Sequence, residues 1–393
     1  MITLEEARRI IDEQVTALPA VPVELSAARG RVLREAITSD GYYPSADRSM
    51  MDGYAIATDD KSERFRVVAE ITPGIESAIT IGQGECARIF TGAIIPAGAS
   101  RVIMQEETQR DGEWMIPTQR TAKRFIRSRG EEAKPGDILL ENRAMLDPAD
   151  LAILAQVGVT APKVSPTPTI THIATGDELI DPSAKPQAGQ IRDTNSTLIR
   201  ALAEQCDAEV QAQSRIGDDL RALVAFASAH PANLLLISGG ASVGEHDFGA
   251  RALRELGYAI HFDRVNLRPG KPLTFATRAD SVAFVIPGNP VSHFVCFHVA
   301  VRLAIECMQA RLPKWSFFSA ELGGNESLRS DPRDTFWPAK VFVTNDGKFI
   351  ANPKRWSSSG DTFSLAGTDA LIRIQTEVQP GASVPTLLLE LPR

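Results

Sequence analysis

The 393-residue sequence lacks the cysteine spacing of a disulfide or zinc framework. Its four cysteines lie far apart and form no CxxC pair: Cys86, Cys206, Cys296 and Cys307. This usage is typical of reduced, mostly buried thiols in a cytosolic protein. The sequence also lacks an apolar run of membrane-spanning length, and its amphipathic, acidic N-terminal segment differs from a signal peptide. We therefore expect a cytoplasmic protein that does not bind membranes.

Motifs of several common enzyme classes are missing as well. The sequence contains no Walker A lysine motif, no GxGxxG fingerprint and no Ser-His-Asp nucleophile elbow. Its histidines, among them His172, His246 and His293, lack metal-ligand spacing. His293 and His298 belong to one apolar segment and are predicted to be core or interface residues. A net charge of −7 and a pI near 5.5 argue against a nucleic-acid partner, so an anionic ligand would need a local group of cations.

The length predicts two to four domains of roughly 150 residues each. Hydrophobic periodicity predicts short β runs in residues 65–117, alternating strands and helices in 169–308, and short β runs again after 313. The predicted fold is multidomain α/β plus β, with a central three-layer α/β domain and a mostly parallel sheet. The expected domains are a helical linker domain (1–41 with 137–165), a small β domain (42–136), the α/β domain (166–312) and a C-terminal β domain (313–393).

The strongest local signal is a buried strand that runs into a glycine turn. Four branched apolar residues, 234–237, precede Ser238-Gly239-Gly240, where bulky side chains stop. Glycines let backbone N–H groups approach a bound anion closely. Asp247 follows, within reach of a metal or a ligand hydroxyl. A phosphate or nucleotide pocket is one interpretation, and a glycine-rich turn without a ligand is the alternative.

Three other predicted strand ends carry residues that can bind ligands: 175–178, 268–271 and 287–289. Strand ends on one edge of a parallel sheet converge on a crevice, where glycine amides and cations suit phosphates and carboxylates suit Mg²⁺. The expected cations are Arg264, Arg268 and Lys271, and the expected carboxylates are Asp177, Glu178, Asp218, Asp219 and Asp247. Pro287 and Asn289 lie at the last of these ends, where Asn289 is predicted to cap a long helix that Pro290 opens. Together the four ends favour a phosphate-bearing ligand.

Seven motifs then occur in a fixed order along nearly the whole chain. They are SMMDGYA (49–55), FTG (90–92), TGDEL (175–179), GQIRDTN (189–195), SGGASVGE (238–245), PGKP (269–272) and PGNP (287–290). Each is weak alone, but the ordered set is specific. The set resembles the molybdopterin molybdenumtransferases, which comprise the bacterial MoeA proteins and the related domain of gephyrin.

The resemblance implies a Mg²⁺-dependent transferase that takes adenylylated molybdopterin and molybdate and releases molybdenum cofactor and AMP. It implies that the α/β domain is of the molybdopterin-binding type. It also implies an elongated homodimer, with the site between the α/β domain of one subunit and the small β domain of the other. Docking with a molybdopterin adenylyltransferase or with molybdoenzyme maturation factors is a further expectation, whereas a preference for molybdate over tungstate stays open.

The resemblance also assigns roles to residues. Asp52 and Thr91 resemble residues contributed by the N-terminal half across the cleft. The acidic residues of the α/β domain are matched by Glu178, Asp218 or Asp219, and Asp247, of which Glu178 and Asp247 are candidate Mg²⁺ ligands. Prolines that shape the pocket floor are matched by Pro272, Pro287 and Pro290. The expected substrate-binding set also includes Glu132, Gly176, Asp177, Ser238, Gly239, Gly240, Ser242, Arg264, Arg268, Lys271 and Asn289.

Two departures from the family pattern concern charged residues. Glu132 stands where an aspartate is common, and is longer by one methylene. Arg264 and Arg268 stand where some members have lysine, and arginine offers a planar fork instead of a point donor. Two other functions remain possible at this stage: a molybdopterin adenylyltransferase, because the α/β domain alone resembles that enzyme, and a non-catalytic molybdopterin-binding scaffold.

Overall fold

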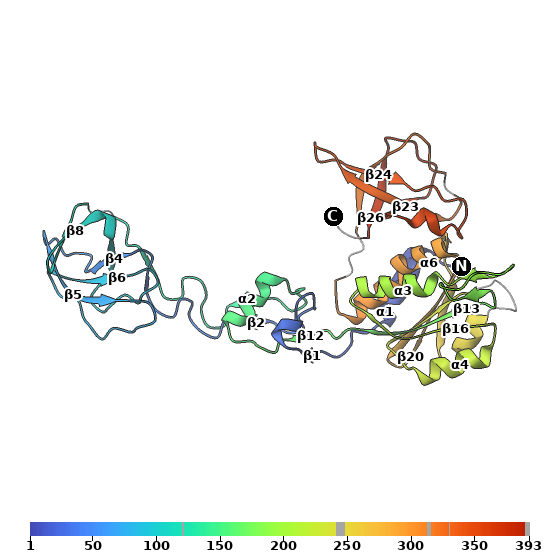
Figure 1. Ribbon diagram of the computed structural model, residues 1–393, viewed down its shortest axis with the longest axis horizontal. Helices are drawn as coiled ribbons and strands as arrows, with labels where there is room; N and C mark the ends of the chain where they lie inside the picture. The colour runs from blue at the N-terminus through green and yellow to red at the C-terminus, as the bar shows by residue number, and fades with distance from the viewer. Residues whose placement is uncertain (120–121, 241–247, 313–315, 330, 390–393) are drawn as a thin grey trace. The chain divides into compact units, whose positions relative to one another are not determined.

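A computed structural model describes residues 1–119, 122–240, 248–312, 316–329 and 331–389. The chain divides into two compact units (Figure 1). One unit combines residues 1–21 with residues 163–393, and the other consists of residues 22–162. Two short strands, β1 (Val21–Pro22) and β12 (Lys163–Val164), lie where the chain passes from one unit to the other.

The first unit contains a six-stranded sheet with the order β16–β13–β17–β21–β20–β18. The strands are β13 (Thr169–Thr175), β16 (Glu209–Ile216), β17 (Leu234–Ser238), β18 (Ala259–Arg264), β20 (Pro272–Arg278) and β21 (Ser281–Ile286). The first four strands in this order are parallel, whereas β20 runs antiparallel to both β21 and β18. The mostly parallel sheet is confirmed, and strand β20 was missed.

Helices cover both faces of this sheet, which confirms the predicted three layers. One face packs against α1 (Leu4–Gln14), α3 (Asn195–Gln205) and the long helical run α6 (Pro290–Cys296), η3 (Phe297–Val301) and α7 (Arg302–Met308). The other face packs against α4 (Leu220–Ala229) and α5 (Phe248–Glu255). Helix α1 buries Leu4, Ala7 and Ile11 here, and so it belongs to the α/β unit and not to the rest of the expected helical linker domain. A short pair, β14 (Leu179–Ile180) and β15 (Ile191–Arg192), lies at the edge of this domain.

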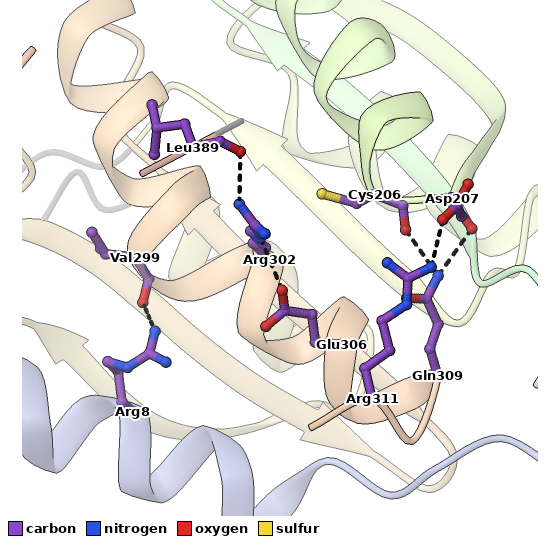
Figure 2. A network of polar contacts seen from close by, with 9 residues as sticks. All are labelled: Arg8, Cys206, Asp207, Val299, Arg302, Glu306, Gln309, Arg311 and Leu389. Carbon is purple, nitrogen blue, oxygen red and sulfur yellow. Dashed lines mark hydrogen bonds and ion pairs between the residues drawn. The ribbon is translucent and has the colours of Figure 1, made fainter. Parts of the chain in front are cut away.

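The segment Pro290–Met308 has the length and apolar composition of a membrane span, yet 89% of its apolar window is buried inside the protein. Polar side chains tie its C-terminal part to its neighbours, as Figure 2 shows. Arg302 donates to the Glu306 carboxylate at 2.9 Å and to the Leu389 carbonyl at 3.3 Å. Gln309 donates to the Cys206 carbonyl at 2.9 Å. The segment is therefore the central core helix of this unit.

The chain after the α/β domain forms a closed β structure, which the short strand β19 (Leu267–Arg268) joins from between β18 and β20. Its other strands are β22 (Phe317–Leu322), β23 (Asp334–Val343), β24 (Phe349–Pro353), β25 (Ala370–Ile374) and β26 (Ser383–Leu388). Because β23 pairs with both β24 and β25, the strands β23, β24, β22, β26 and β25 form a ring. The barrel core is apolar, and the short helix η4 (Thr362–Leu365) follows the 355–361 loop.

The second unit holds a six-stranded sheet with the order β7–β4–β6–β5–β9–β8. These strands are β4 (Gly53–Ile56), β5 (Phe65–Ile71), β6 (Glu85–Ile89), β7 (Arg101–Met104), β8 (Thr108–Asp111) and β9 (Trp114–Pro117). Shorter elements complete the unit: η1 (Leu25–Ala27), β2 (Ile37–Thr38), β3 (Arg48–Ser49), η2 (Gln105–Glu107), β10 (Ile126–Arg127), β11 (Ile138–Leu140) and α2 (Pro148–Gln156). Residues 53–117 therefore form a sheet of their own, while the predicted domain boundaries of 42–136 stay a prediction.

Candidate functional site

Three parallel strands of the α/β domain end at the same edge of the sheet. The register pairs Ala174 of β13 with Ser238 of β17, and Ser238 with Ile286 of β21. The segments that follow them, 175–178, 238–240 and 287–289, therefore leave the sheet side by side. Their backbones meet closely, because the Gly239 N–H donates to the Ile286 carbonyl at 3.0 Å. This edge is the rim that the sequence predicts, and we call it the rim.

The fourth predicted segment, 268–271, reaches the same rim for a different reason. Contrary to the prediction, it follows no parallel strand of this sheet and instead precedes the antiparallel strand β20. Since an antiparallel strand begins where its neighbour ends, Pro272 starts beside the end of β21. Arg264 pairs with Pro272 in the register of β18 and β20 and lies at this edge as well.

The glycine turn at the rim has no space for side chains. Gly239 has a φ of +93° and Gly240 a φ of +65°, which L side chains rarely adopt. A Cβ at Gly239 would lie 2.7 Å from both the carbonyl and the hydroxyl oxygen of Thr175. The turn is thus of the narrow kind in which backbone atoms can approach an anion. Ser242 and Asp247 lie outside the described residues.

Carboxylates gather at the neighbouring loop of the rim. Asp177 accepts a hydrogen bond of 3.0 Å from the Asp218 backbone N–H, so the two loops touch. The exposed Glu178 carboxylate folds back over Gly176, where a Cβ would meet it at 2.6 Å. Asp219 instead caps α4 by accepting from the backbone N–H of Arg221 at 2.9 Å. Of the two aspartates left open by the sequence, Asp218 is therefore the one that does not cap a helix.

These carboxylates can bind Mg²⁺ only together with phosphate oxygens of a substrate and water. Within the part of the chain that the structure describes, no three His, Cys, Asp or Glu side chains form a metal-binding group. Mg²⁺ is, however, commonly held by one or two carboxylates together with waters and substrate phosphates. Asp177 and Glu178 supply oxygen donors of this type beside the glycine turn, so the donor set fits the ion.

A pocket of about 400 Å³ opens between the rim and the β barrel. From the rim it is lined by Arg268, Pro269, Gly270, Lys271, Pro272, Pro287, Asn289 and Ser292. From the barrel it is lined by Arg333, Trp337, Trp356 and Ser357–Ser359. Five of the predicted substrate-binding residues therefore meet in one cavity. Arg264 is at the same edge but does not line it.

The pocket carries a surplus of positive charge. Among the described lining residues, Arg268, Lys271 and Arg333 are cationic. Next to the pocket, Asp331 accepts hydrogen bonds of 2.9 and 2.6 Å from Arg333 and lies 3.7 Å from the Arg268 guanidinium. The hydrogen bonds from Arg333 keep the pKa of Asp331 below its ordinary value. This carboxylate orients both guanidinium groups while leaving net positive charge for an oxyanion.

Asn289 does not cap its helix through its side chain, which corrects the sequence prediction. It occupies the N-cap position of α6, but its Nδ2 donates to the Ser359 hydroxyl at 2.9 Å. The Val291 N–H likewise donates to the Ser359 carbonyl at 2.9 Å. Ser359 of the barrel thus accepts a hydrogen bond from the Val291 N–H at the start of α6, and these contacts join the barrel to the rim.

Sequence reasoning missed the contribution of the barrel to this pocket. The run from Ser357 to Ser359 is polar, but nothing in the sequence links it to the rim. Arg333 and Trp337 lie before and within β23, where a strand pattern gives no sign of ligand binding. Trp356 packs edge-on against Trp337, with ring centroids 5.6 Å apart.

In the second unit, the structure brings Asp52 and Thr91 together. Asp52 follows β3 and precedes β4, and its carboxylate accepts from both the N–H and the hydroxyl of Thr91 at 2.8 Å. These hydrogen bonds, the backbone one foremost, lower the pKa of Asp52, so this exposed carboxylate is ionised at neutral pH. Glu132 is also exposed and forms an ion pair of 2.9 Å with Arg127.

Three family models cover the chain in order. Residues 2–158 match the MoeA N-terminal region (domains I and II), residues 171–306 a probable molybdopterin-binding domain, and residues 325–389 the MoeA C-terminal region (domain IV). A molybdopterin molybdenumtransferase of Nostoc sp. is 35% identical over 389 residues, which are 94% of this chain and 88% of that protein. The chain belongs to the molybdopterin molybdenumtransferase family. It is thus a transferase of molybdenum cofactor biosynthesis, as the resemblance implied.

Other relatives agree with this membership. The molybdopterin molybdenumtransferase of Bacillus subtilis is 32% identical over 366 residues, which are 89% of this chain and 84% of that protein. Two crystal structures of the molybdopterin biosynthesis MoeA protein of Pyrococcus horikoshii superpose with TM-scores of 0.85 and 0.81, at 25% and 27% identity. Each covers 99% of this chain and at least 99% of the solved chain. The predicted fold class is confirmed.

Proposed function

We propose that this protein inserts molybdate into adenylylated molybdopterin and releases molybdenum cofactor and AMP. The observation that carries the proposal is the junction of a narrow glycine turn with a cationic pocket at one rim of the α/β domain. Phosphate groups and an oxyanion would then be held beside each other. The names of the relatives support molybdenum transfer to molybdopterin.

The reaction needs one bond to break in the adenylylated substrate. Water adds across the phosphoanhydride, which leaves a phosphate on molybdopterin and releases AMP. The turn that starts at Ser238 holds the phosphates together with Gly176, and Asp177 joins the neighbouring loop by accepting from the Asp218 N–H. The predicted contribution of Ser242 lies outside the described residues. Glu178 would hold Mg²⁺ with Asp247, and a bound ion would supply charge withdrawal from the anhydride. Positioning and electrostatics perform the work, so no covalent enzyme intermediate is required.

Molybdate would occupy the pocket between the rim and the barrel. Lys271, Arg268 and Arg333 offer charged N–H donors, and Pro272 and Pro287 line the same pocket as stiff side chains. Charge-assisted hydrogen bonds of this kind are short and strong, and the arginine fork matches an oxyanion at two oxygens. Arginine can therefore serve where other family members use lysine.

The carboxylate of Asp52 is assigned to the site of a second copy of the chain. We propose a homodimer in which the Asp52 and Thr91 pair of one subunit completes the rim of the other. Two hydrogen bonds from Thr91 orient the ionised carboxylate of Asp52 without a ligand, which supports this role. The four free cysteines, three of them buried, support the cytoplasm as the compartment.

The test is molybdate-dependent AMP release from adenylylated molybdopterin by the full chain. The wild type is expected to release AMP with molybdate present, whereas Asp52→Ala and Glu178→Ala should each stop release while keeping the wild-type circular dichroism and melting temperature. Asp59→Ala, which alters another exposed aspartate of the second unit, should behave as the wild type. Unchanged release by both active-site variants would refute their assignment. No turnover by the wild type would favour a scaffold, and consumption of ATP would favour an adenylyltransferase.

A further inference from the structure

A chain of hydrogen bonds runs directly beneath the glycine turn. The Ser238 hydroxyl lies 2.7 Å from Nε2 of His172 on β13 and 2.7 Å from Nε2 of His293 on α6. All three residues are buried, with exposed fractions of 1% or less. They join two strands and a helix at the first residue of the turn. The reaction proposed above makes no use of either histidine.

The neighbouring Gln213 determines which atoms donate in this series of hydrogen bonds. Arg200 donates to Oε1 of Gln213 at 3.0 Å, so the amide nitrogen of Gln213 faces inward, 2.9 Å from Nδ1 of His172. Because an amide nitrogen only donates, His172 must accept at Nδ1 and carry its proton on Nε2. His172 therefore donates to the Ser238 oxygen. Ser238 in turn donates its own proton to Nε2 of His293.

Both rings are neutral in this arrangement. Burial lowers the pKa of His172 to about 4 and also lowers the pKa of His293, so neither ring is charged at neutral pH. A positive charge on His172 would add a proton at Nδ1, opposite the Gln213 donor. The network thus fixes the Ser238 hydroxyl without placing a charge near the rim.

The rest of Ser238 is held as well. Its carbonyl accepts from the Thr175 hydroxyl at 3.3 Å, and the next residue, Gly239, donates to Ile286. Strand β13 holds the side chain and the carbonyl of Ser238, helix α6 also holds the side chain, and strand β21 holds the following N–H. A site whose donors are already oriented loses less free energy on binding than one that must be ordered by its ligand.

We propose that His172 and His293 are positioning residues, which hold Ser238 so that the glycine turn is preorganised for the phosphates of the substrate. This inference rests on the proposed function, because it takes the turn to be the phosphate site. The histidines touch no substrate atom. They act through Ser238.

The experiment compares three variants of the full chain with the wild type. His293→Leu leaves the buried Ser238 hydroxyl proton without its acceptor, whereas His293→Gln keeps an acceptor of similar reach. The matched control is His298→Leu on the same helical run. His298 is buried between the Phe294 and Phe297 rings, and neither of its ring nitrogens has a hydrogen-bond partner in the described part of the protein.

Two quantities are measured: the dissociation constant of AMP by calorimetry, and KM and kcat for AMP release. We expect His293→Leu to raise the AMP dissociation constant and KM by about tenfold, with a smaller change in kcat. His293→Gln should restore both to within about threefold, and His298→Leu should match the wild type. If His293→Leu fails to fold, His293→Gln and Ser238→Ala are compared by the same two measurements, and Ser238→Ala should then weaken AMP binding while His293→Gln does not.

Each outcome distinguishes the inference from the function on which it rests. If the wild type binds AMP and His293→Leu binds it equally well, the positioning role is wrong and the proposed function stands. An equal loss in His298→Leu also overturns the role, because the effect would then come from removing any buried histidine. If the wild type neither binds nor releases AMP, the proposed function falls and the inference falls with it.

Discussion

Two polar regions of the α/β domain lie at the same rim and are built in opposite ways. The network of His172, Ser238 and His293 is buried, neutral and joined by short hydrogen bonds. The pocket beside Arg268 and Arg333 is open and charged, and the carboxylate of Asp331 offsets only part of its positive charge. The first region holds the Ser238 hydroxyl by hydrogen bonds without a ligand, and the second has positive charge that an anionic ligand can match.

The difference follows from the cost of burying charge. An ionised group loses several kcal/mol of hydration on burial unless partners replace its water, so a rigid support inside the core is best made from neutral donors and acceptors. Guanidinium groups near the surface keep part of their hydration until an anion displaces it. We infer that the neutral region gives the rim its shape and the charged region gives it affinity. The following predictions test this division.

The largest effect is expected from Arg333→Ala. This change removes a cation from the pocket and also frees Asp331, whose carboxylate then offsets a larger share of the charge of Arg268. The KM for molybdate should rise by about tenfold to a hundredfold, the range expected for lost charge-assisted hydrogen bonds. AMP release at varied molybdate concentration measures this change.

Its matched control lies on the neighbouring loop. Arg355 is an exposed arginine that pairs with Glu326 and does not line the pocket. Arg355→Ala removes the same charge from the same barrel and should leave the KM for molybdate unchanged. An equal rise in both variants would mean that the general charge of the barrel, and not the pocket, attracts molybdate.

The sequence predicts the rim well because rim formation is a local property of each strand. The run from Leu234 to the glycines at 239 and 240 is enough to predict a buried strand and a narrow turn, and the structure has both. The parallel register then brings three such ends together without further information. Family motifs add roles for residues such as Asp52, whose contact with Thr91 no local pattern could predict.

The remainder depends on tertiary packing. The sequence could not reveal that Arg333 and Trp337, on a separate barrel, would face Lys271 across a pocket. Likewise, His172 and His293 each look like core residues, because their shared partner Ser238 becomes visible only when strand and helix are packed. Such contacts join distant parts of the chain, and their patterns are those of ordinary strands and helices.

The second effect concerns the neutral core and its response to acid. Burial lowers the pKa of His298 to about 3, whereas an unfolded histidine has a pKa of about 6.5. Between these values the unfolded chain binds a proton that the folded chain does not, so the free energy of unfolding falls as the pH decreases. In His298→Leu, the free energy of unfolding should fall by about 1.4 kcal/mol less than in the wild type for each pH unit below 6.5. Urea unfolding at pH 7, 6 and 5, followed by circular dichroism, measures it.

His172 and His293 remain in this variant and keep part of the acid sensitivity, so the slope decreases but does not vanish. The arginines of the pocket stay protonated in both the folded and the unfolded state over this range and contribute no slope. If the slopes of the wild type and the variant coincide, His298 titrates in the folded protein, and burial in this core does not keep a histidine neutral.

The smallest effect is expected from salt. The Debye length falls from about 10 Å at 0.1 M to about 3 Å at 1 M ionic strength, which screens the partly exposed guanidinium groups of Arg268 and Arg333. The KM for molybdate should therefore rise by roughly threefold to tenfold over this range. The ratio of AMP dissociation constants between His293→Leu and the wild type should stay constant, because salt does not reach a buried hydrogen bond between neutral groups. If the KM for molybdate does not change with salt, the pocket does not attract molybdate through its charge. If the ratio of AMP dissociation constants changes with salt, the histidine network carries charge.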